Sequence, residues 1–413
     1  MTSRERVLAA IAHKSPDRVP LDLGSTPSSG ISAIAYNNLK KHLGISDGHT
    51  RVFDVVQQVV QPEDGILDRF GVDVIDIGRV FNETDAHWYD VTLSDGSTAQ
   101  YPIWFRPEQQ PNGDWIAYHK DGTKIARMPV GATFFDQTYF PYEEDYPDNY
   151  DDLDEQMGKV LWSALVHSPW DHAGEENFYQ TLRERVIQLR NSTDKALMIT
   201  CGCNLFEWGT FLRRMDNFLM DIYCDEENVE ALVEQLMVRH LATLEKVCAA
   251  VGDVVDILRF GDDLGMTTGL FMAPEKYQKL FKPHHTKLNE YVHAHSNMKT
   301  LLHSCGSLYP IIPDLIEAGY DILNPVQTSA RQMDPETLKR EFGKDITFWG
   351  AGCDTKSVLN RGTPDQVYDH CRRMIEIFNQ DGGFVFNQEH NILPDVPPEN
   401  ILAMYRAVQD SAK

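Results

Sequence analysis

The stretch Lys299-Thr-Leu-Leu-His303, followed by a segment that ends at Gly319 and then by Asp321-Ile-Leu-Asn324, decides the fold. The two short apolar runs predict buried strands, and the segment between them predicts a helix that ends at a glycine. Strands that alternate with helices pair in parallel, because each parallel neighbour needs a crossover connection. This unit therefore predicts an α/β fold built on a parallel sheet.

The same alternation continues through most of the chain. Strands are expected at Val19–Leu23, Val72–Ile77, Ala196–Cys201, Val254–Phe260, Thr300–His303, Asp321–Asn324, Ile346–Gly350 and Phe384–Asn387. A helix is expected near residues 52–70, before the second of these strands. Eight parallel strands close naturally into a barrel. We therefore predict a (β/α)8 TIM barrel that forms a single domain over residues 1–413.

One region departs from this alternation. Between residues 88 and 137, short strand-like runs are separated by Asp-Gly and Asn-Gly pairs, which is the signal of antiparallel hairpins. An acidic stretch rich in Tyr and Pro, from Tyr142 to Glu155, follows and predicts a solvated loop that leads into a helix. Residues 88–155 are therefore predicted to form a β-hairpin and loop insertion in the barrel.

The composition argues against several classes of function. The chain has 413 residues, 42% of them hydrophobic, which is enough for one large core. Its 38 basic and 62 acidic residues give a net charge of −24 at pH 7, which argues against nucleic acid or an anionic membrane as the partner. The N-terminal segment does not resemble a signal peptide, and the apolar runs are too short for a membrane span. Seven cysteines without a disulfide spacing suit a reducing compartment, so we expect a cytoplasmic protein.

Polar and sulfur-bearing residues gather where the predicted strands end. In a (β/α)8 barrel, the carboxyl ends of the strands carry the active site. Asp22, Asn324, Gln327 and His390 lie at these ends and are expected to bind the substrate. Cys201, Asp262, Asp263, His303, Cys353 and Asn387 lie there too.

A histidine and two cysteines predict a metal site. His303 and Cys305 are two positions apart, so at an extended strand end their side chains point to the same side. Cys353 follows another strand of the same sheet. Zn²⁺ takes nitrogen and thiolate ligands together, and three protein ligands leave an open position for catalysis. The pattern predicts a catalytic zinc held by His303, Cys305 and Cys353, with core packing of a histidine and two inert thiols as the alternative.

The remaining candidates each have a structural alternative. Asp262 and Asp263 form a carboxylate pair that suits proton transfer or the binding of a cation, whereas Asp263 could instead cap a helix. Glu207 could be a general base or a labile fourth zinc ligand, or an exposed residue in the first turn of a helix. Cys201, in a Cys-x-Cys motif, could line the pocket, although packing is the more frequent role of buried cysteine.

Four phrases of the sequence together resemble the uroporphyrinogen decarboxylase superfamily. They are His303-Ser-Cys-Gly-Ser, Ile312-Pro-Asp-Leu-Ile-Glu-Ala-Gly-Tyr-Asp-Ile-Leu-Asn-Pro-Val-Gln327, Phe348-Trp-Gly-Ala-Gly-Cys-Asp and His390-Asn-Ile-Leu-Pro-Asp-Val-Pro-Pro-Glu-Asn. Within the superfamily, the sequence most resembles the zinc-dependent methyltransferases that work with corrinoid proteins. The resemblance implies a barrel of the uroporphyrinogen decarboxylase type, in which His303, Cys305 and Cys353 hold the zinc. True decarboxylases of this superfamily carry an N-terminal arginine motif that binds the tetrapyrrole, and Leu21-Asp-Leu-Gly-Ser-Thr-Pro stands in that region here.

The function that this resemblance implies is methyl transfer from a small methylated substrate, such as a methyl ether, to the cobalt of a corrinoid protein. The corrinoid would come on a separate partner, because no Asp-x-His-x-x-Gly phrase for cobalamin binding occurs in the chain. Asp262 or Asp263 would tune protonation of the leaving group, and Glu207 would hold the resting metal. Three alternatives stay open: thiol methylation from a methyl-corrinoid, a metal-independent decarboxylase or lyase, and a binding protein braced by zinc.

Overall fold

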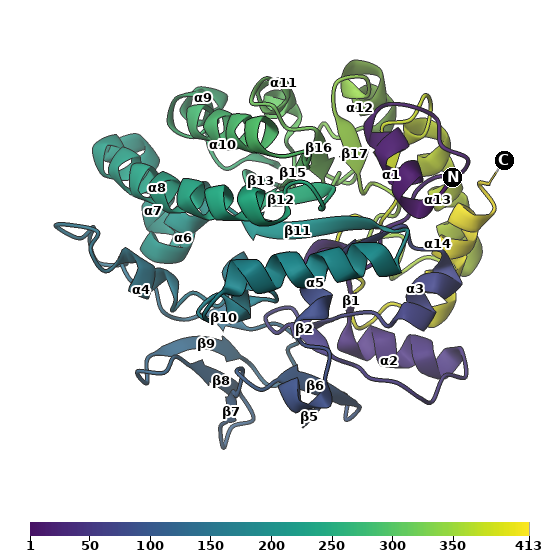
Figure 1. Ribbon diagram of the computed structural model, residues 1–413, viewed down its shortest axis with the longest axis horizontal. Coiled ribbons are helices and arrows are strands. Elements are labelled where there is room, and N and C mark those ends of the chain that lie inside the picture. The colour runs from purple at the N-terminus through teal and green to yellow at the C-terminus, as the bar shows by residue number, and fades with distance from the viewer. Residues whose placement is uncertain (413) are drawn as a thin grey trace.

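A curved parallel sheet forms the centre of the computed structural model, which describes residues 1–412 (Figure 1). Seven strands pair in the order β18-β17-β16-β15-β12-β11-β4. Their bounds are Val74–Asp76 (β4), Ala196–Gly202 (β11), Ile257–Gly261 (β12), Lys299–His303 (β15), Ile322–Asn324 (β16), Thr347–Trp349 (β17) and Phe384–Val385 (β18). Each of them lies in a region where the sequence predicted a strand.

A short extended segment closes this sheet into a barrel. Leu21 forms a parallel bridge with Phe386 next to β18, and Asp22 forms one with Val74 of β4. The backbone N–H of Asp22 donates to the carbonyl of Phe386 at 2.9 Å, and the N–H of Asp73 donates to the carbonyl of Leu21 at 2.8 Å. The segment therefore takes the place of an eighth strand between the two edges, and the predicted (β/α)8 fold is confirmed.

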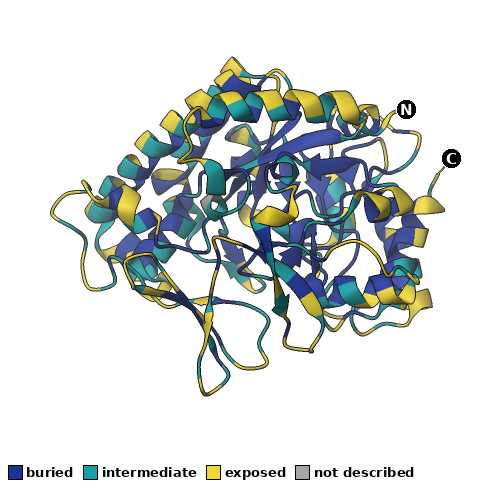
Figure 2. Cartoon of the chain, turned by 60° about the horizontal axis from the view of Figure 1, so that its bottom comes forward, coloured by how far each residue is buried: buried dark blue, intermediate teal, exposed yellow. Residues whose placement is uncertain are grey.

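Helices cover the outside of the barrel, with their buried faces toward the sheet and their exposed faces toward solvent (Figures 1 and 2). The main ones are Ala33–His42 (α2), Asp64–Phe70 (α3), Phe178–Ser192 (α5), Phe206–Arg213 (α6), Met215–Cys224 (α7), Glu226–Val251 (α8), Pro274–Leu280 (α9), Lys282–His295 (α10), Ile312–Glu317 (α11), Pro335–Phe342 (α12), Pro364–Phe378 (α13) and Pro398–Gln409 (α14). None of the helices within residues 1–412 has the length and apolar character that crossing a membrane requires.

Inside the barrel, an apolar layer lies below a polar one. The apolar layer is a cluster of Val74, Ala196, Met198, Ile257, Leu301, Ile322, Trp349 and Val385, which packs on Val7, Ala10 and Ile11 of helix α1 (Ser3–Ile11). Helix α1 thus covers the amino-terminal end of the barrel. Because side chains alternate along a strand, the next inward positions lie two residues further on. They hold Asp76, Arg259, His303, Asn324 and Asn387.

The predicted antiparallel hairpins are confirmed, and they extend from one side of the barrel (Figure 1). One hairpin joins Trp88–Thr92 (β5) to Thr98–Pro102 (β6), and a second sheet contains Glu108–Gln109 (β7), Trp115–Tyr118 (β8), Lys124–Met128 (β9) and Asp136–Gln137 (β10). The Asp-Gly and Asn-Gly pairs fall in the turns between these strands. The short helix Leu153–Met157 (α4) follows.

The helix expected near residues 52–70 is wrong in its first half. Val52–Asp54 (β2) and Val59–Val60 (β3) form a small antiparallel sheet with Ile31–Ser32 (β1), and the helix α3 begins only at Asp64. The valines of this segment are β-branched and favour strands. Pro62 then interrupts the backbone donors that a continuous helix would need.

A buried carboxylate fixes the closing segment at the amino-terminal end of the barrel. Asp73 is completely buried and accepts hydrogen bonds from Nη1 of Arg6 at 2.6 Å and from both terminal nitrogens of Arg18 at 2.6 and 2.8 Å. It also accepts the backbone N–H of Leu21 at 2.8 Å. Charge-assisted bonds of this kind are stronger than neutral ones. Asp73 therefore ties helix α1, the closing segment and β4 together.

We expect Asp73→Asn to lower the free energy of unfolding by about 3–5 kcal/mol, because two arginines lose their shared buried counter-ion. Urea unfolding followed by circular dichroism measures this change. The matched control is Asp17→Asn, which removes a partner of Arg6 whose side chain is 46% exposed. An exposed pair contributes about 0–1 kcal/mol, so equal losses in the two variants would contradict the role given to Asp73.

Candidate metal centre

His303, Cys305 and His390 bring nitrogen and sulfur ligand atoms together at the carboxyl end of the barrel. One such atom from each residue lies within 4.8 Å of the others. Nε2 of His303 is 3.7 Å from Sγ of Cys305, and the ring centroids of His303 and His390 are 6.0 Å apart. His303 ends β15, whereas His390 belongs to the loop after β18. Two imidazoles and a thiol form a donor set that suits Zn²⁺.

Asn324 fixes the ring of His303. Nδ2 of Asn324 donates to the carbonyl of Trp349 at 3.0 Å, so its Oδ1 is the atom that faces Nδ1 of His303 at 2.9 Å. This network assigns the hydrogen to Nδ1, because an amide oxygen only accepts. The lone pair of His303 is then on Nε2, the nitrogen that lies beside Cys305. Partners of this type orient histidines that bind metals.

Asn391 holds His390 in the same manner. Nδ2 of Asn391 donates to Oε1 of Gln57 at 3.2 Å, and its Oδ1 lies 2.9 Å from Nδ1 of His390. Gln57 is itself anchored, because its Nε2 donates to Asp54 at 3.0 Å. The same reasoning assigns the hydrogen to Nδ1 of His390. Both imidazoles therefore keep Nε2 available as a ligand atom.

The surroundings favour the uncharged forms of the two ligands at β15. Burial lowers the pKa of His303 well below its usual value, and the positive charges of Arg259 and His390 lower it further. Burial raises the pKa of the Cys305 thiol well above its usual value, and Asp263 and Glu207 add to this effect. A bound cation reverses the balance for the thiol, because it stabilises the thiolate.

The structure does not place Cys353 in this set. Cys353 is fully buried, its Sγ lies 3.9 Å from the carbonyl of Asp354, and Cys371 is a neighbour within the core. Its backbone carbonyl accepts the N–H of Glu389 at 3.0 Å, so its loop runs beside the loop of His390. The third position near His303 and Cys305 is thus taken by His390, which the sequence analysis assigned to substrate. A ligand role for Cys353 stays a prediction.

The predicted carboxylate pair divides into two different environments. Asp262 accepts the N–H groups of Phe206 at 3.0 Å and Glu207 at 2.8 Å, which open helix α6, and it also contacts Nε2 of His285 at 3.1 Å. Asp262 is therefore the helix cap, a role that the sequence offered for Asp263. Asp263 instead accepts the N–H of Cys305 at 2.8 Å and lies 3.8 Å from Nε2 of His303. A catalytic role for Asp262 has no support in these contacts.

Glu207 lies in the first turn of α6 beside these aspartates. Nδ2 of Asn204 donates a hydrogen bond to its Oε2. Burial raises the pKa of Glu207 well above its usual value, and the negative charges of Asp263 and Asp262 raise it further. The side chain therefore favours the protonated form near neutral pH.

The other predicted substrate ligands contact protein groups. Asp22 is fully buried, accepts Nε1 of Trp349 at 3.0 Å, and has a pKa that burial raises. Oε1 of Gln327 accepts the N–H of Gly306 at 2.7 Å. Gly306 has a φ of 95°, and a Cβ there would lie 2.5 Å from the backbone of Gly265. Gln327 thus holds the tight turn after Cys305, and substrate contacts of Asp22 and Gln327 stay predictions.

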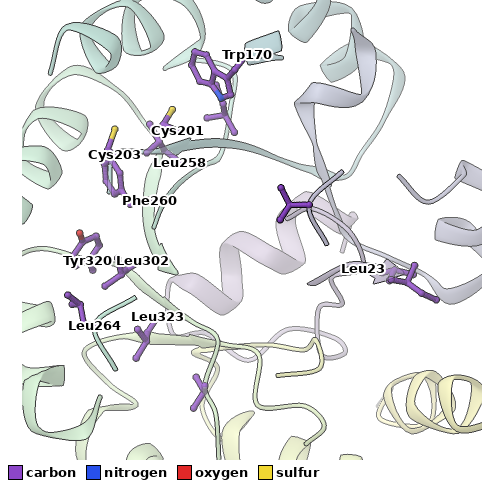
Figure 3. Close-up of a cluster of buried hydrophobic side chains, with 14 of the residues drawn as sticks. Leu23, Trp170, Cys201, Cys203, Leu258, Phe260, Leu264, Leu302, Tyr320 and Leu323 are labelled. Atoms are coloured by element: carbon purple, nitrogen blue, oxygen red, sulfur yellow. The ribbon is translucent and has the colours of Figure 1, made fainter. Parts of the chain in front are cut away.

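Cys201 and Cys203 pack in the large hydrophobic cluster. Figure 3 shows their side chains among Trp170, Leu258 and Phe260. Burial raises the pKa of both thiols. These contacts fit the packing alternative that the sequence left open for Cys201.

Two inward residues of the polar layer escaped the sequence reasoning. Asp76 follows Val74 on β4, and burial raises its pKa to about 7. Arg259 follows Ile257 on β12 and is 8% exposed. Both lie in strands that the sequence predicted, so the alternation of inward positions could have identified them.

A family model described as uroporphyrinogen decarboxylase (URO-D) matches residues 200–411. The chain belongs to the uroporphyrinogen decarboxylase family. Two curated family relatives, both named uroporphyrinogen decarboxylase, come from Magnetococcus marinus and Methylococcus capsulatus. The first is 24% identical over 100 residues, which is 24% of this chain and 26% of the relative. The second is 28% identical over 96 residues, which is 23% of this chain and 25% of the relative.

These matches span only about a quarter of the length of the curated relatives. A solved methyltransferase from Methanosarcina mazei has a TM-score of 0.59 at 16% identity and covers 99% of both chains. A solved B12-independent methionine synthase from Shewanella sp. has a TM-score of 0.40 at 12% identity, over 83% of this chain and 84% of its own. The Methanosarcina structure shows that the family fold extends over the whole chain.

We expect Asn324→Ala to weaken Zn²⁺ binding by about 10- to 100-fold, because His303 loses the group that orients its ring. Competition with a chromophoric chelator measures the affinity. The control is Asn149→Ala on an exposed loop, which should bind Zn²⁺ as the wild type does. An unchanged affinity in a folded Asn324→Ala protein would show that this amide does not orient a ligand.

Proposed function

We propose that this protein is a zinc-dependent methyltransferase, which moves a methyl group from a small methylated substrate, such as a methyl ether, to the cobalt of a corrinoid protein. The observation that carries the proposal is the group of His303, Cys305 and His390 at the mouth of the barrel. Among residues 1–412, this group has three members and no fourth protein ligand that would close it. An incomplete shell of nitrogen and sulfur ligands is typical of catalytic zinc sites.

The donor set fits Zn²⁺ in chemistry as well as in number. His303 and His390 would bind through Nε2, since their Nδ1 atoms are engaged with Asn324 and Asn391. Cys305 would bind as the thiolate, and its proton would leave when the metal binds. The bound ion would supply a Lewis acid for the oxygen from which the methyl group departs.

Glu207 and Asp263 are the groups that manage the proton of this reaction. The protonated Glu207 is the acid that protonates the leaving oxygen as its bond to the methyl carbon breaks, so that the product leaves as an alcohol. Asp263 accepts the N–H of Cys305 and so fixes the backbone that carries this ligand. The methyl group passes to the corrinoid cobalt, which supplies the electron pair of the new bond.

A second candidate is decarboxylation without a metal, which the names of the curated relatives favour. The region of residues 21–27, where the decarboxylases hold their arginine motif, contains no arginine in this chain. The acidic net charge of −24 also disfavours a polyanionic tetrapyrrole as substrate. Methyl transfer therefore agrees better with the groups that are present.

The proposal predicts about one Zn²⁺ per chain in the purified protein, as measured by plasma mass spectrometry. The zinc content should fall to about a tenth or less in His390→Ala and in Cys305→Ser, because each removes a ligand from a three-residue shell. Cys353→Ser should keep its zinc. The reverse result, loss in Cys353→Ser and retention in His390→Ala, would restore the ligand set expected from the sequence. A zinc-free wild type would favour decarboxylation.

We expect Glu207→Gln to slow methylation of a Co(I) corrinoid protein by about 10²- to 10⁴-fold while the zinc content is unchanged, because the amide cannot donate the proton that the leaving oxygen needs. The change in corrinoid absorbance reports the rate. Glu176→Gln, on an exposed loop, is the control and should react at the wild-type rate. A normal rate in Glu207→Gln would assign the acid to another residue.

A further inference from the structure

Arg259 projects into the barrel next to the metal centre. It lies on β12 two residues after Ile257, which belongs to the cluster inside the barrel. Leu258 and Phe260, its sequence neighbours, belong instead to the large cluster on the other side of the sheet (Figure 3). Side chains alternate along a strand, so Arg259 points inward from the layer above Ile257.

The guanidinium of Arg259 lacks a partner within the described chain. Its Nε atom is buried without a hydrogen bond, and its neighbours Glu207, Asp263, Cys305 and Asp54 act on it only through longer-range electrostatics. Other shielded arginines of this protein behave differently. Arg6 and Arg190, for example, lie 2.6 Å and 2.5 Å from aspartate oxygens.

The nearby acids are already committed to other donors. Asp54 accepts the backbone N–H groups of Val56 and Gln57 and the side chain of Gln57. Asp263 accepts the N–H of Cys305, and Glu207 favours its protonated form. An arginine cannot lose its proton in a protein, and burying an unpaired charge is costly. The missing partner of Arg259 is therefore an anion that comes from outside the chain.

We propose that Arg259 binds a carboxylate of the substrate, so that the methyl donor is a methoxy-carboxylic acid. A planar guanidinium and a carboxylate form two parallel hydrogen bonds, which fix orientation as well as position. The charge of Arg259 is felt by both His303 and Cys305, so an anchored carboxylate would hold its methoxy oxygen beside the ligand group. This inference rests on the proposed function, and it excludes methylated ammonium compounds, which Arg259 would repel.

The test compares three anionic methyl ethers with their neutral amides: methoxyacetate, 3-methoxypropionate and 4-methoxybenzoate. Calorimetry on the zinc-loaded protein without corrinoid measures binding. We expect at least one acid to bind about 10-fold more tightly than its amide, because the amide lacks the charge-assisted pair. The preference should vanish in Arg259→Gln and return in part in Arg259→Lys. Arg183→Gln, which breaks an exposed pair with Asp253, should keep it.

Binding and turnover separate this inference from the proposed function. An acid that binds through Arg259 but does not methylate the corrinoid would keep the carboxylate site and reject methyl transfer. Conversely, equal turnover of acid and amide, with an unchanged KM in Arg259→Gln, would keep methyl transfer and overturn the carboxylate site. The absence of any Arg259-dependent preference in all three pairs would also overturn it, provided that the variant shows the wild-type unfolding midpoint.

Discussion

The pairing of the segment at Leu21 and Asp22 with both edges of the sheet is the constraint on which the site depends. Seven parallel strands alone would leave an open curved sheet, in which β4 and β18 present unpaired backbone groups. Closure makes the inner face a lumen that α1 seals from one end. The active end then receives side chains from all sides, so that His390, which follows β18, meets His303 of β15. Asp73 and its two arginines hold this closure from below.

The polar layer above the apolar cluster explains why the site is rigid. A buried polar group is costly unless it is hydrogen-bonded, so each imidazole of the centre is matched by an amide whose own orientation is fixed by another partner. Asn324 is fixed by the carbonyl of Trp349, and Asn391 by Gln57. The ligand atoms are thereby set before any metal arrives. Such preorganisation lowers the cost of assembling a catalytic centre.

The sequence predicted the barrel well because its strands are short apolar runs and its turns carry Gly, both of which are local signals. It failed at residues 52–60, where a valine-rich stretch before Pro62 was assigned to a helix and forms strands. The site was predicted in position but only partly in membership. Whether Cys353 or His390 reaches His303 depends on two adjacent loops and on which way each side chain turns, and residue spacing does not encode this. The same holds for Asp262 and Asp263, where packing against α6 decides which one becomes the cap.

Charge balance connects the ligand group with Arg259. A divalent ion at His303, Cys305 and His390 is neutralised by the Cys305 thiolate and by the carboxylate of Asp263, which lies 3.8 Å from Nε2 of His303. Glu207 adds no charge in its protonated form, so Arg259 remains as one uncompensated positive charge in a poorly solvated space. One carboxylate from a ligand makes the whole site neutral, whereas a neutral ether leaves a charge and a cationic amine adds one. Because electrostatic energies grow as water is excluded, the anionic ligand is the one that can close the site most favourably.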